Sequence, residues 1–377
     1  MALEKLISAD SHVVEPPDLW QTRTDAKFRD RAPRVVSKGD VDNWIVDEDI
    51  LIGSIGGPTQ AGRRYTDLEN LEIEGSYEEI PAAAYDPHER LKAMEVDGVV
   101  GELVYSTIGT RLFTVDVRGE LLSACFRALN DWSAEFGQAY PDRLKGTGVI
   151  SFDDIDDAIS ELQRCAGMGL AGLVIPAYVS EDRYYDQPEF EPFWAAAQDA
   201  GLPIGMHSGS VRPGPGRIGA FANNAAITGT SAFRATQDYW VRRSVASMIF
   251  GGVFERYPRL KVGVVEYELA WAPYFIKQMD MAYKEHRYVT EIKFKGDKLP
   301  SDVFHENLFV CFQEDELGIA LREVIGVDNI MFGSDYPHRE STWPNSRKVL
   351  AKVLKGVPEE EQEKIVYSNA ARLYGFN

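Results

Sequence analysis

The chain has 377 residues, of which 44% are hydrophobic and 26% are charged, and its formal net charge at pH 7 is −19. This composition is typical of a folded protein with a sizeable core, and it excludes an intrinsically disordered chain. The acidic balance disfavours nucleic acid and anionic membrane surfaces as partners, because both require clustered Lys and Arg. We therefore expect the partner to be a small-molecule substrate.

The length allows either two average domains or one large α/β barrel, and we favour a single domain over residues 1–377. The three cysteines are far apart and odd in number, which predicts a reducing compartment and no disulfide framework. We see no secretory leader and no apolar run near the roughly 20 residues of a membrane span. We expect a cytoplasmic protein that forms a homo-oligomer.

The first predicted strand covers residues 5–9 and leads directly into Asp10, Ser11 and His12. Because side chains in a strand alternate between its two faces, Asp10 and His12 lie on one face and can reach one metal ion. Glu15 follows in a proline-rich loop, which we expect to lie over the same mouth.

The pattern of residues 21–85 does not predict alternating strands and helices. They contain a hairpin-like pair of short strands around residues 43–46 and 50–52, followed by a Gly-rich stretch at 53–62. An insertion of this size after the first strand is either a cap over the substrate or a purely structural excursion.

From residue 86 onward, short apolar runs alternate with amphipathic stretches, and a capping pattern at Asp86, Pro87 and Glu89 predicts the first helix. The strands are predicted at residues 99–105, 146–151, 172–176, 202–206, 260–266, 307–313 and 330–332. The remaining helices are predicted at residues 116–140, 153–168, 188–200, 230–257, 271–286, 345–354 and 358–374, with a short one after residue 315 and a Gly- and Pro-rich loop at 210–219. About eight strands, each followed by a helix, predict an α/β protein with a (β/α)8 TIM barrel, an insertion after strand 1 and extra C-terminal helices.

Three of the six histidines, His12, His207 and His338, fall at predicted strand ends beside carboxylates. The carboxyl ends of barrel strands meet at one mouth, where active sites are built. Imidazole and carboxylate together are common ligands of divalent metals, so we predict that His12 and His207 are metal ligands. For His338 we keep two alternatives, a metal ligand or a catalytic base beside the metal.

Two carboxylates follow predicted strands. Asp335 comes after the apolar run 330–332, where burying its charge would be costly without a cation or strong hydrogen bonds, so we predict a ligand that can also move a proton. Glu266 ends another strand and is either a ligand or a salt-bridge partner, with Glu268 nearby as a competing carboxylate.

The residues at these strand ends resemble those of the amidohydrolase superfamily, in particular the amidohydrolase-related branch that includes aminocarboxymuconate-semialdehyde decarboxylase. The likeness rests on Asp10-Ser11-His12, on His207-Ser208-Gly209, and on the segments 334–338 and 368–375. It implies a (β/α)8 barrel with one or two divalent metals at its mouth. Asp10, His12, His207 and Asp335 stand at the positions of the family's metal ligands.

Two positions depart from that pattern. The strand at 172–176 is followed by no Lys that could be carboxylated to bridge two metals, and Glu266 stands where many relatives carry His. With Asp10, Glu15, Glu266 and Asp335 as ligands, the site is more anionic than a zinc site prefers. Zn²⁺ or Mn²⁺ suits one metal, whereas two inward-turned glutamates, Glu15 and Glu266, would favour two iron ions.

The sequence therefore predicts a metal-dependent enzyme that hydrolyses or decarboxylates a small organic acid or its derivative. In this interpretation Asp10, His12, His207 and Asp335 hold the metal, and Asp335 or His338 moves the proton. The first alternative is a non-heme di-iron monooxygenase on the same barrel. The second is a barrel that has lost catalysis and only binds a ligand.

Overall fold

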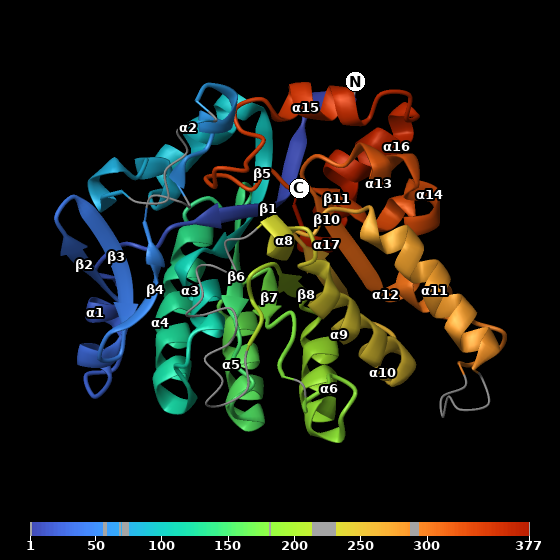
Figure 1. Cartoon of the computed structure of the whole chain (residues 1–377), viewed down its shortest axis with the longest axis horizontal. Helices are drawn as coiled ribbons and strands as arrows, with labels where there is room; N and C mark the ends of the chain where they lie inside the picture. Colours follow the sequence, from blue (N-terminus) through green and yellow to red (C-terminus); the bar gives the residue numbers. More distant parts are fainter. Residues whose placement is uncertain are drawn as a thin grey trace.

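The computed structural model describes residues 2–55, 59–67, 69, 75–180, 182–212, 231–286 and 294–376. Its centre is an eight-stranded parallel sheet in which the strands neighbour one another in chain order (Figure 1). The strands are β1 (Leu6–Val13), β5 (Val99–Ser106), β6 (Leu144–Val149), β7 (Gly172–Ile175), β8 (Ile204–His207), β9 (Val262–Val265), β10 (Leu308–Phe312) and β11 (Ile330–Phe332). Helices surround the sheet, and the predicted (β/α)8 barrel is confirmed.

Four of the barrel strands, β7, β9, β10 and β11, are apolar along their length because both faces of the sheet are covered. Every residue of β7, β9, β10 and β11 is buried. A parallel sheet covered by helices on one face and filled by side chains on the other needs such continuous apolar runs. This explains why the strands were visible in the sequence as short hydrophobic segments.

The barrel is closed between β1 and β11 by backbone hydrogen bonds of the candidate site residues themselves. The amide of His12 donates to Tyr336 O at 2.6 Å, and the amide of Asp335 donates to Asp10 O at 2.8 Å. A Cβ atom added at Gly333 would lie 2.4 Å from Asp10 Cβ. The two strands therefore approach closely only because residue 333 has no side chain.

The insertion forms a three-stranded antiparallel sheet of β2 (Arg34–Lys38), β3 (Val41–Val46) and β4 (Ile50–Ser54). The predicted hairpin is β3 and β4, whereas β2 was not predicted. Trp44 of β3 packs edge-on against Trp20, so this sheet lies at the side of the barrel. The later part of the insertion reaches the segment after β11, where the amide of Ala61 donates to Pro337 O at 3.0 Å.

The helices agree with the predicted ranges in most places. Their bounds are α1 (Leu19–Arg23), α2 (Pro87–Asp97), α3 (Ile108–Arg111), α4 (Gly119–Gln138), α5 (Ile155–Gly167), α6 (Glu191–Ala200), α8 (Ser231–Arg234), α9 (Asp238–Phe250), α10 (Val253–Arg256), α11 (Trp271–Glu285), α12 (Pro300–Asn307), α13 (Glu316–Ala320), α14 (Arg322–Ile325), α15 (Ser346–Val353), α16 (Glu359–Glu363) and α17 (Asn369–Tyr374). Helix α2 begins as predicted, with the Asp86 side chain accepting hydrogen bonds from the amides of His88 and Glu89.

Three differences concern the helices. The single helix predicted at 230–257 is divided into α8, α9 and α10, and the one predicted at 358–374 contains a π-helical turn, Lys364–Ser368, between α16 and α17. Helices α1, α3, α12 and α14 were not predicted. The Gly- and Pro-rich loop predicted at 210–219 lies mostly outside the described residues. Within the described part of the chain, none of the helices is long and apolar enough to cross a membrane.

Candidate metal centre

The ends of four barrel strands bring ligand-type side chains together. Asp10 and His12 lie in β1, His207 ends β8, Glu266 follows β9, and the segment after β11 carries Asp335, His338 and Glu340. Their nitrogen and oxygen atoms form three groups, each within 4.8 Å: Asp10, His12 and His207; His12, Asp335 and His338; and Glu266, Asp335 and Glu340.

The first group has the geometry of ligands that share an ion. His12 Nε2 and His207 Nε2 are 3.0 Å apart, and Asp10 Oδ1 lies 3.3 Å from His207 Nε2 and 3.5 Å from His12 Nε2. Two nitrogens, each about 2.1 Å from a common metal ion, would be separated by about this distance. All three side chains are buried.

Asp335 shows most directly that these residues fit a cation. Its side chain is 0% exposed, and its carboxylate oxygens accept no well-aligned hydrogen bond, although His338 Nδ1 lies 2.7 Å from Oδ1. Oδ1 lies 3.5 Å from His12 Nε2. Burial, together with the charges of Glu266 and Glu340, raises the pKa of Asp335 well above its ordinary value. A bound divalent cation would remove this cost, because it would pair with the carboxylate.

The backbone is strained at two of the site carboxylates. Asp335 has φ 57° and Glu266 has φ 63°, both in the left-handed region that non-Gly residues avoid at a cost of roughly 1–2 kcal/mol each. Glu266 immediately follows β9, and Asp335 lies three residues beyond the end of β11, so both positive-φ residues are in the turns at the barrel mouth. Such strain is concentrated at functional sites.

Glu266 turns inward, as one of its two predicted alternatives required. Its Oε2 lies 3.4 Å from His207 Nε2 and accepts a hydrogen bond of 2.7 Å from Ser208 Oγ. The competing residue Glu268 is held outside the site, where its oxygens accept hydrogen bonds of 3.2 Å from the amides of Gln313 and Glu314.

Glu15 is not brought into the cluster, and this geometry gives no support to its predicted role as a ligand. Its carboxylate accepts hydrogen bonds from the Ser106 hydroxyl and from the amides of Ile108 and Gly109, at 3.0 and 3.1 Å. Glu15 therefore binds the first turn of α3, next to the barrel mouth but not at the metal ligands. Burial raises its pKa.

His338 connects Asp335 to the rim of the site. Its Nδ1 lies 2.7 Å from Asp335 Oδ1, and its Nε2 is 3.1 Å from Thr107 Oγ1. Burial lowers the pKa of His338 to about 4. Both predicted roles of His338 are compatible with this position, because it is adjacent to His12 and Asp335 and also reaches a hydroxyl group.

The electrostatics of the first group, Asp10, His12 and His207, favour a positive charge between these side chains. Burial disfavours a charge on His207, but the nearby Asp10 and Glu266 overcome it and raise the pKa of His207 to about 9. Burial likewise opposes ionisation of Asp10, yet His207 and His12 hold its pKa below the usual range. The carboxylates that stabilise an imidazolium would equally stabilise a metal ion.

A buried polar network holds the backbone of the site residues in place. The Arg90 guanidinium of α2 is 0% exposed and donates to Glu102 Oε2 at 2.6 Å, to His12 O at 2.8 Å and to Tyr336 O at 3.3 Å. Ser11 Oγ donates to Glu102 at 3.2 Å. These contacts fix the backbone beside His12 and Asp335, whose side chains face the metal site.

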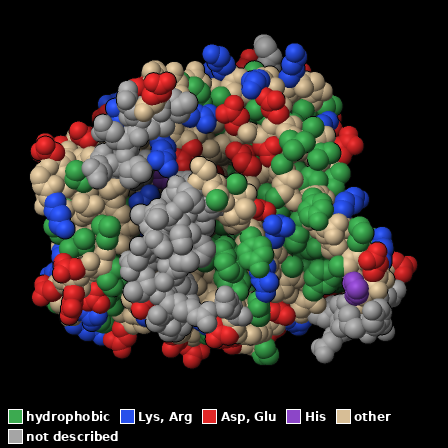
Figure 2. Space-filling model, viewed as in Figure 1, with side chains coloured by type: hydrophobic (Ala, Val, Ile, Leu, Met, Phe, Trp, Pro, Cys, Tyr) green, Lys and Arg blue, Asp and Glu red, His purple; other side chains and the backbone are tan. Residues whose placement is uncertain are grey.

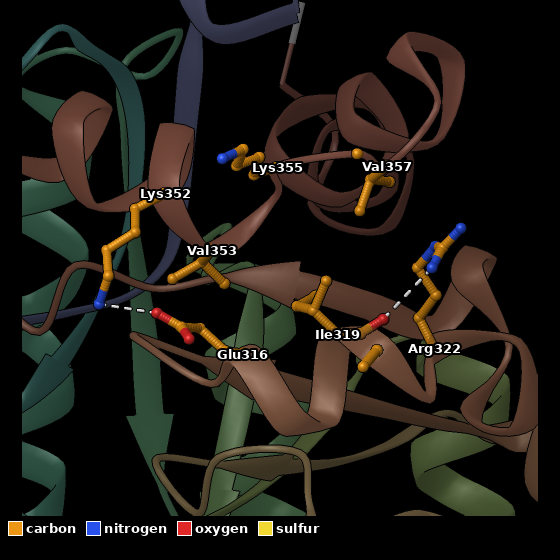
Figure 3. Close-up of a pocket in the computed structure, with 9 residues that line it drawn as sticks. Glu316, Ile319, Arg322, Lys352, Val353, Lys355 and Val357 are labelled. Atoms are coloured by element: carbon orange, nitrogen blue, oxygen red, sulfur yellow. Dashed lines mark hydrogen bonds and ion pairs between the residues drawn. The ribbon is translucent and has the colours of Figure 1, made fainter.

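Glu340 was not assigned a role from the sequence. The only available signal was its place in the same short segment as Asp335 and His338, which is a weak one because that segment also contains Arg339. A surface pocket between α13, α14 and α15 is separate from the site, and there Lys352 pairs with Glu316 at 2.7 Å (Figure 3).

Comparison with known proteins gives consistent results. The family model described as amidohydrolase matches residues 109–376. Gamma-resorcylate decarboxylase from Polaromonas sp. (strain JS666) is 27% identical over 267 residues, which cover 67% of this chain and 76% of the relative. The crystal structure of an amidohydrolase from Mycobacterium avium subsp. paratuberculosis K-10 superimposes with a TM-score of 0.75 at 23% identity, over 98% of this chain and 99% of that one.

A second solved structure with the same fold contains a metal. It is a dihydroxybenzoic acid decarboxylase from Polaromonas sp. JS666, crystallised with bound manganese and the inhibitor 2-nitroresorcinol. It superimposes with a TM-score of 0.63 at 19% identity, over 99% of this chain and 97% of that one.

Proposed function

The chain belongs to the amidohydrolase family, and on that basis we propose that it is a metal-dependent decarboxylase of a small aromatic carboxylic acid. The observation that carries the proposal is the fully buried carboxylate of Asp335, which lies 3.5 Å from His12 Nε2, beside a pair of histidine nitrogens that are 3.0 Å apart. The decarboxylase activity of the relatives supports decarboxylation over hydrolysis, the other reaction predicted from the sequence.

Four residues would hold the metal in this proposal: Asp10, His12, His207 and Asp335. Their mixed nitrogen and oxygen donors suit Mn²⁺ or Zn²⁺, and the bound manganese of the related decarboxylase supports Mn²⁺. When bound, the ion would fix the substrate's oxygen atoms and withdraw charge from them. The protein residues supply the orientation and the proton.

The reaction requires a proton at the ring carbon that bears the carboxylate. Protonation of that carbon interrupts the aromatic ring, the bond to the carboxylate then breaks, and its electrons restore the ring as CO2 leaves. Asp335 is the proposed donor, because it lies in the site and can receive a proton from His338, whose Nδ1 is 2.7 Å from its Oδ1. His338, at 2.7 Å from Asp335 Oδ1 and 3.1 Å from Thr107 Oγ1, is positioned to return the proton.

The experiment is a CO2-release assay on the Mn²⁺-loaded protein with 2,6-dihydroxybenzoate and a panel of other hydroxybenzoates. The expected result is turnover of at least one acid, with metal content and turnover both lost in the double variant His12→Ala, His207→Ala. An unchanged metal content in that variant would contradict the metal assignment. Turnover of esters or amides, without CO2 release, would favour hydrolysis.

The di-iron monooxygenase alternative required both Glu15 and Glu266 to turn inward, and only Glu266 lies beside the histidines of the site. The relatives described above are decarboxylases or an amidohydrolase, and they do not support it. Substrate-dependent oxygen uptake by an iron-loaded sample would establish the oxygenase, and CO2 release without oxygen uptake would exclude it.

We further propose that the chain forms a single domain and a homo-oligomer. Light scattering of the purified protein tests the oligomeric state.

A further inference from the structure

Thr107 precedes the first residue of α3, yet its side chain does not cap that helix. A threonine at this position ordinarily accepts a hydrogen bond from an amide of the first turn. Thr107 makes no such bond. Instead the Glu15 carboxylate accepts hydrogen bonds from the amides of Ile108 and Gly109, at 3.0 and 3.1 Å. Because Glu15 takes over the capping of α3, the Thr107 hydroxyl is available to another partner.

That partner is the imidazole of His338. Thr107 Oγ1 lies 3.1 Å from His338 Nε2, and Thr107 is 4% exposed. The amide of Thr107 donates to Val13 O at 3.1 Å, which ties its backbone to the end of β1. The hydroxyl therefore approaches the ring from a fixed position.

Glu15 binds the chain on both sides of Thr107. It is 0% exposed, and it accepts a hydrogen bond from the Ser106 hydroxyl as well as those from the two amides of α3. Burying a carboxylate is costly unless hydrogen bonds compensate the lost hydration, and here these bonds go to one turn of the chain, residues 106–109. The buried carboxylate thus fixes the turn that carries the Thr107 hydroxyl.

The two ring nitrogens of His338 face different groups. Nδ1 lies 2.7 Å from Asp335 Oδ1, whereas Nε2 faces Thr107. The ring also lies against the imidazole of His12, with their centroids 4.0 Å apart. A neutral imidazole donates from one nitrogen and accepts at the other, but a hydroxyl can do either. Thr107 can therefore pair with Nε2 in both tautomers, and in both it keeps Nδ1 turned toward Asp335.

We propose that Thr107 is a positioning residue, which holds the His338 ring with Nδ1 toward Asp335. Glu15 is a second positioning residue, which acts through Thr107 by fixing the turn at 106–109. The effect on turnover rests on the proposed function, in which His338 returns the proton to Asp335. Neither Thr107 nor Glu15 belongs to the groups that could hold a metal, so their substitution should spare the metal content.

The first experiment compares Thr107→Val, which removes the hydroxyl at nearly constant shape, with Thr107→Ser, which keeps it. In CO2-release assays of the Mn²⁺-loaded protein, we expect Thr107→Val to lower kcat by about 10-fold with KM and metal content unchanged. Thr107→Ser is expected to keep most of the rate. Thr147→Val is the matched control, because the Thr147 hydroxyl is also buried but donates to Val104 O at 3.0 Å, and its kcat should not change.

A double-mutant cycle tests whether Glu15 acts through Thr107. Glu15→Gln alone is expected to lower kcat, because it loses a hydrogen bond to the turn, and to add little further loss in the Thr107→Val background. Losses in kcat that multiply in the double variant would contradict this link. Thermal unfolding of each variant establishes that the measured loss belongs to a folded protein.

Nitrogen NMR of the His338 ring gives a readout that does not depend on turnover. In Zn²⁺-loaded protein with ¹⁵N-labelled histidine, the His338 signals are identified by their loss in His338→Gln. Thr107→Val is expected to shift the Nε2 signal, and Thr147→Val to leave it in place. An unchanged Nε2 signal in Thr107→Val would overturn the orienting role of the hydroxyl, and an unchanged kcat would overturn its role in turnover.

The two proposals fail in different ways. Absence of CO2 release from the unmodified protein with every acid would contradict the decarboxylase, and the NMR comparison would then decide the orientation of His338 by itself. CO2 release that is equal in the unmodified protein and in Thr107→Val would leave the decarboxylase intact and contradict the positioning role.

Discussion

At the scale of single residues, the site is determined by which buried polar atoms have partners. Arg90 and Glu102 form a buried ion pair whose hydrogen-bonding atoms are occupied by each other, by backbone carbonyls and by Ser11. Asp335 is equally buried, but its oxygens have no such partners. Satisfied charges hold the structure together, whereas the unsatisfied one indicates the position of a ligand.

Asp335→Asn should therefore affect activity and stability in opposite directions. We expect turnover to fall by about 10²-fold or more, because the proton donor is lost. We also expect the metal-free protein to unfold at a higher temperature at neutral pH, because folding then no longer requires Asp335 to take up a proton or to bury its charge. CO2 release and thermal unfolding in a chelator measure the two effects. Glu102→Gln is the control, and it should lower the unfolding temperature because it leaves Arg90 without its charge partner.

Glu15→Gln tests whether that residue is a ligand. Its oxygens bind Ser106 and the first amides of α3, so the variant should keep its metal content. The amide nitrogen of Gln cannot accept a hydrogen bond, and we expect stability to fall by about 1–3 kcal/mol as one partner is lost. Elemental analysis and denaturant unfolding give the two values. A stoichiometric loss of metal with an intact fold would restore Glu15 to the ligand set.

At the scale of elements, the candidate metal site lies where the barrel closes between β1 and β11. The hydrogen bonds from His12 to Tyr336 and from Asp335 to Asp10 join the end of β1 to the segment after β11. Ligands on these two elements are therefore positioned by the same contacts that close the sheet. Any change that separates β1 from β11 also separates the ligands.

Gly333→Ala should test this coupling. The added Cβ would meet Asp10 Cβ at 2.4 Å and Asp10 Cα at 3.3 Å, so the two elements must move apart. We expect stability to fall by about 1–3 kcal/mol and metal affinity to fall with it. Gly167→Ala is the control, because a Cβ there meets nothing within 4 Å and that helical position should gain stability. An unchanged metal affinity in Gly333→Ala would contradict the coupling.

At the scale of the whole molecule, the acidic charge on the face seen in Figure 2 is distributed and not gathered in one patch. Figure 2 shows Asp and Glu side chains spread over the visible face among Lys and Arg. Part of the net charge of −19 comes from the carboxylates at the barrel mouth. The prediction that a bound cation offsets part of the acidity is consistent with that arrangement.

Metal removal should therefore destabilise the entire barrel. The candidate ligands lie on β1 and β8 and after β9 and β11, so one bound ion joins elements that are far apart in the sequence. At a free Mn²⁺ concentration of about 100 times its Kd, binding would add about 2.7 kcal/mol to the free energy of unfolding. Calorimetry with and without a chelator should show a transition that moves by several degrees. An unfolding temperature independent of Mn²⁺ would contradict a metal site in the folded state.

Much of this molecule is determined by local sequence. The eight barrel strands follow from short apolar runs, because a sheet buried on both faces requires them. Asp10 and His12 share a face because residues two apart in a strand always do. His207 directly follows such a run and Asp335 comes three residues after another, and the end of a parallel strand places the side chains that follow it at the barrel mouth. Candidate ligands at strand ends are thus predictable from spacing.

Only the tertiary structure distinguished Glu15 from Glu340. Both are loop carboxylates a few residues beyond a ligand, and local spacing treats them alike. Glu15 lies away from the candidate ligands because its carboxylate accepts hydrogen bonds from the first amides of α3, which lies about 90 residues later in the sequence. Glu340 lies beside Asp335 and Glu266 because the segment after β11 packs against β1 and faces the end of β9. The orientation of a loop side chain depends on which distant groups the fold places beside it, and no local periodicity encodes that.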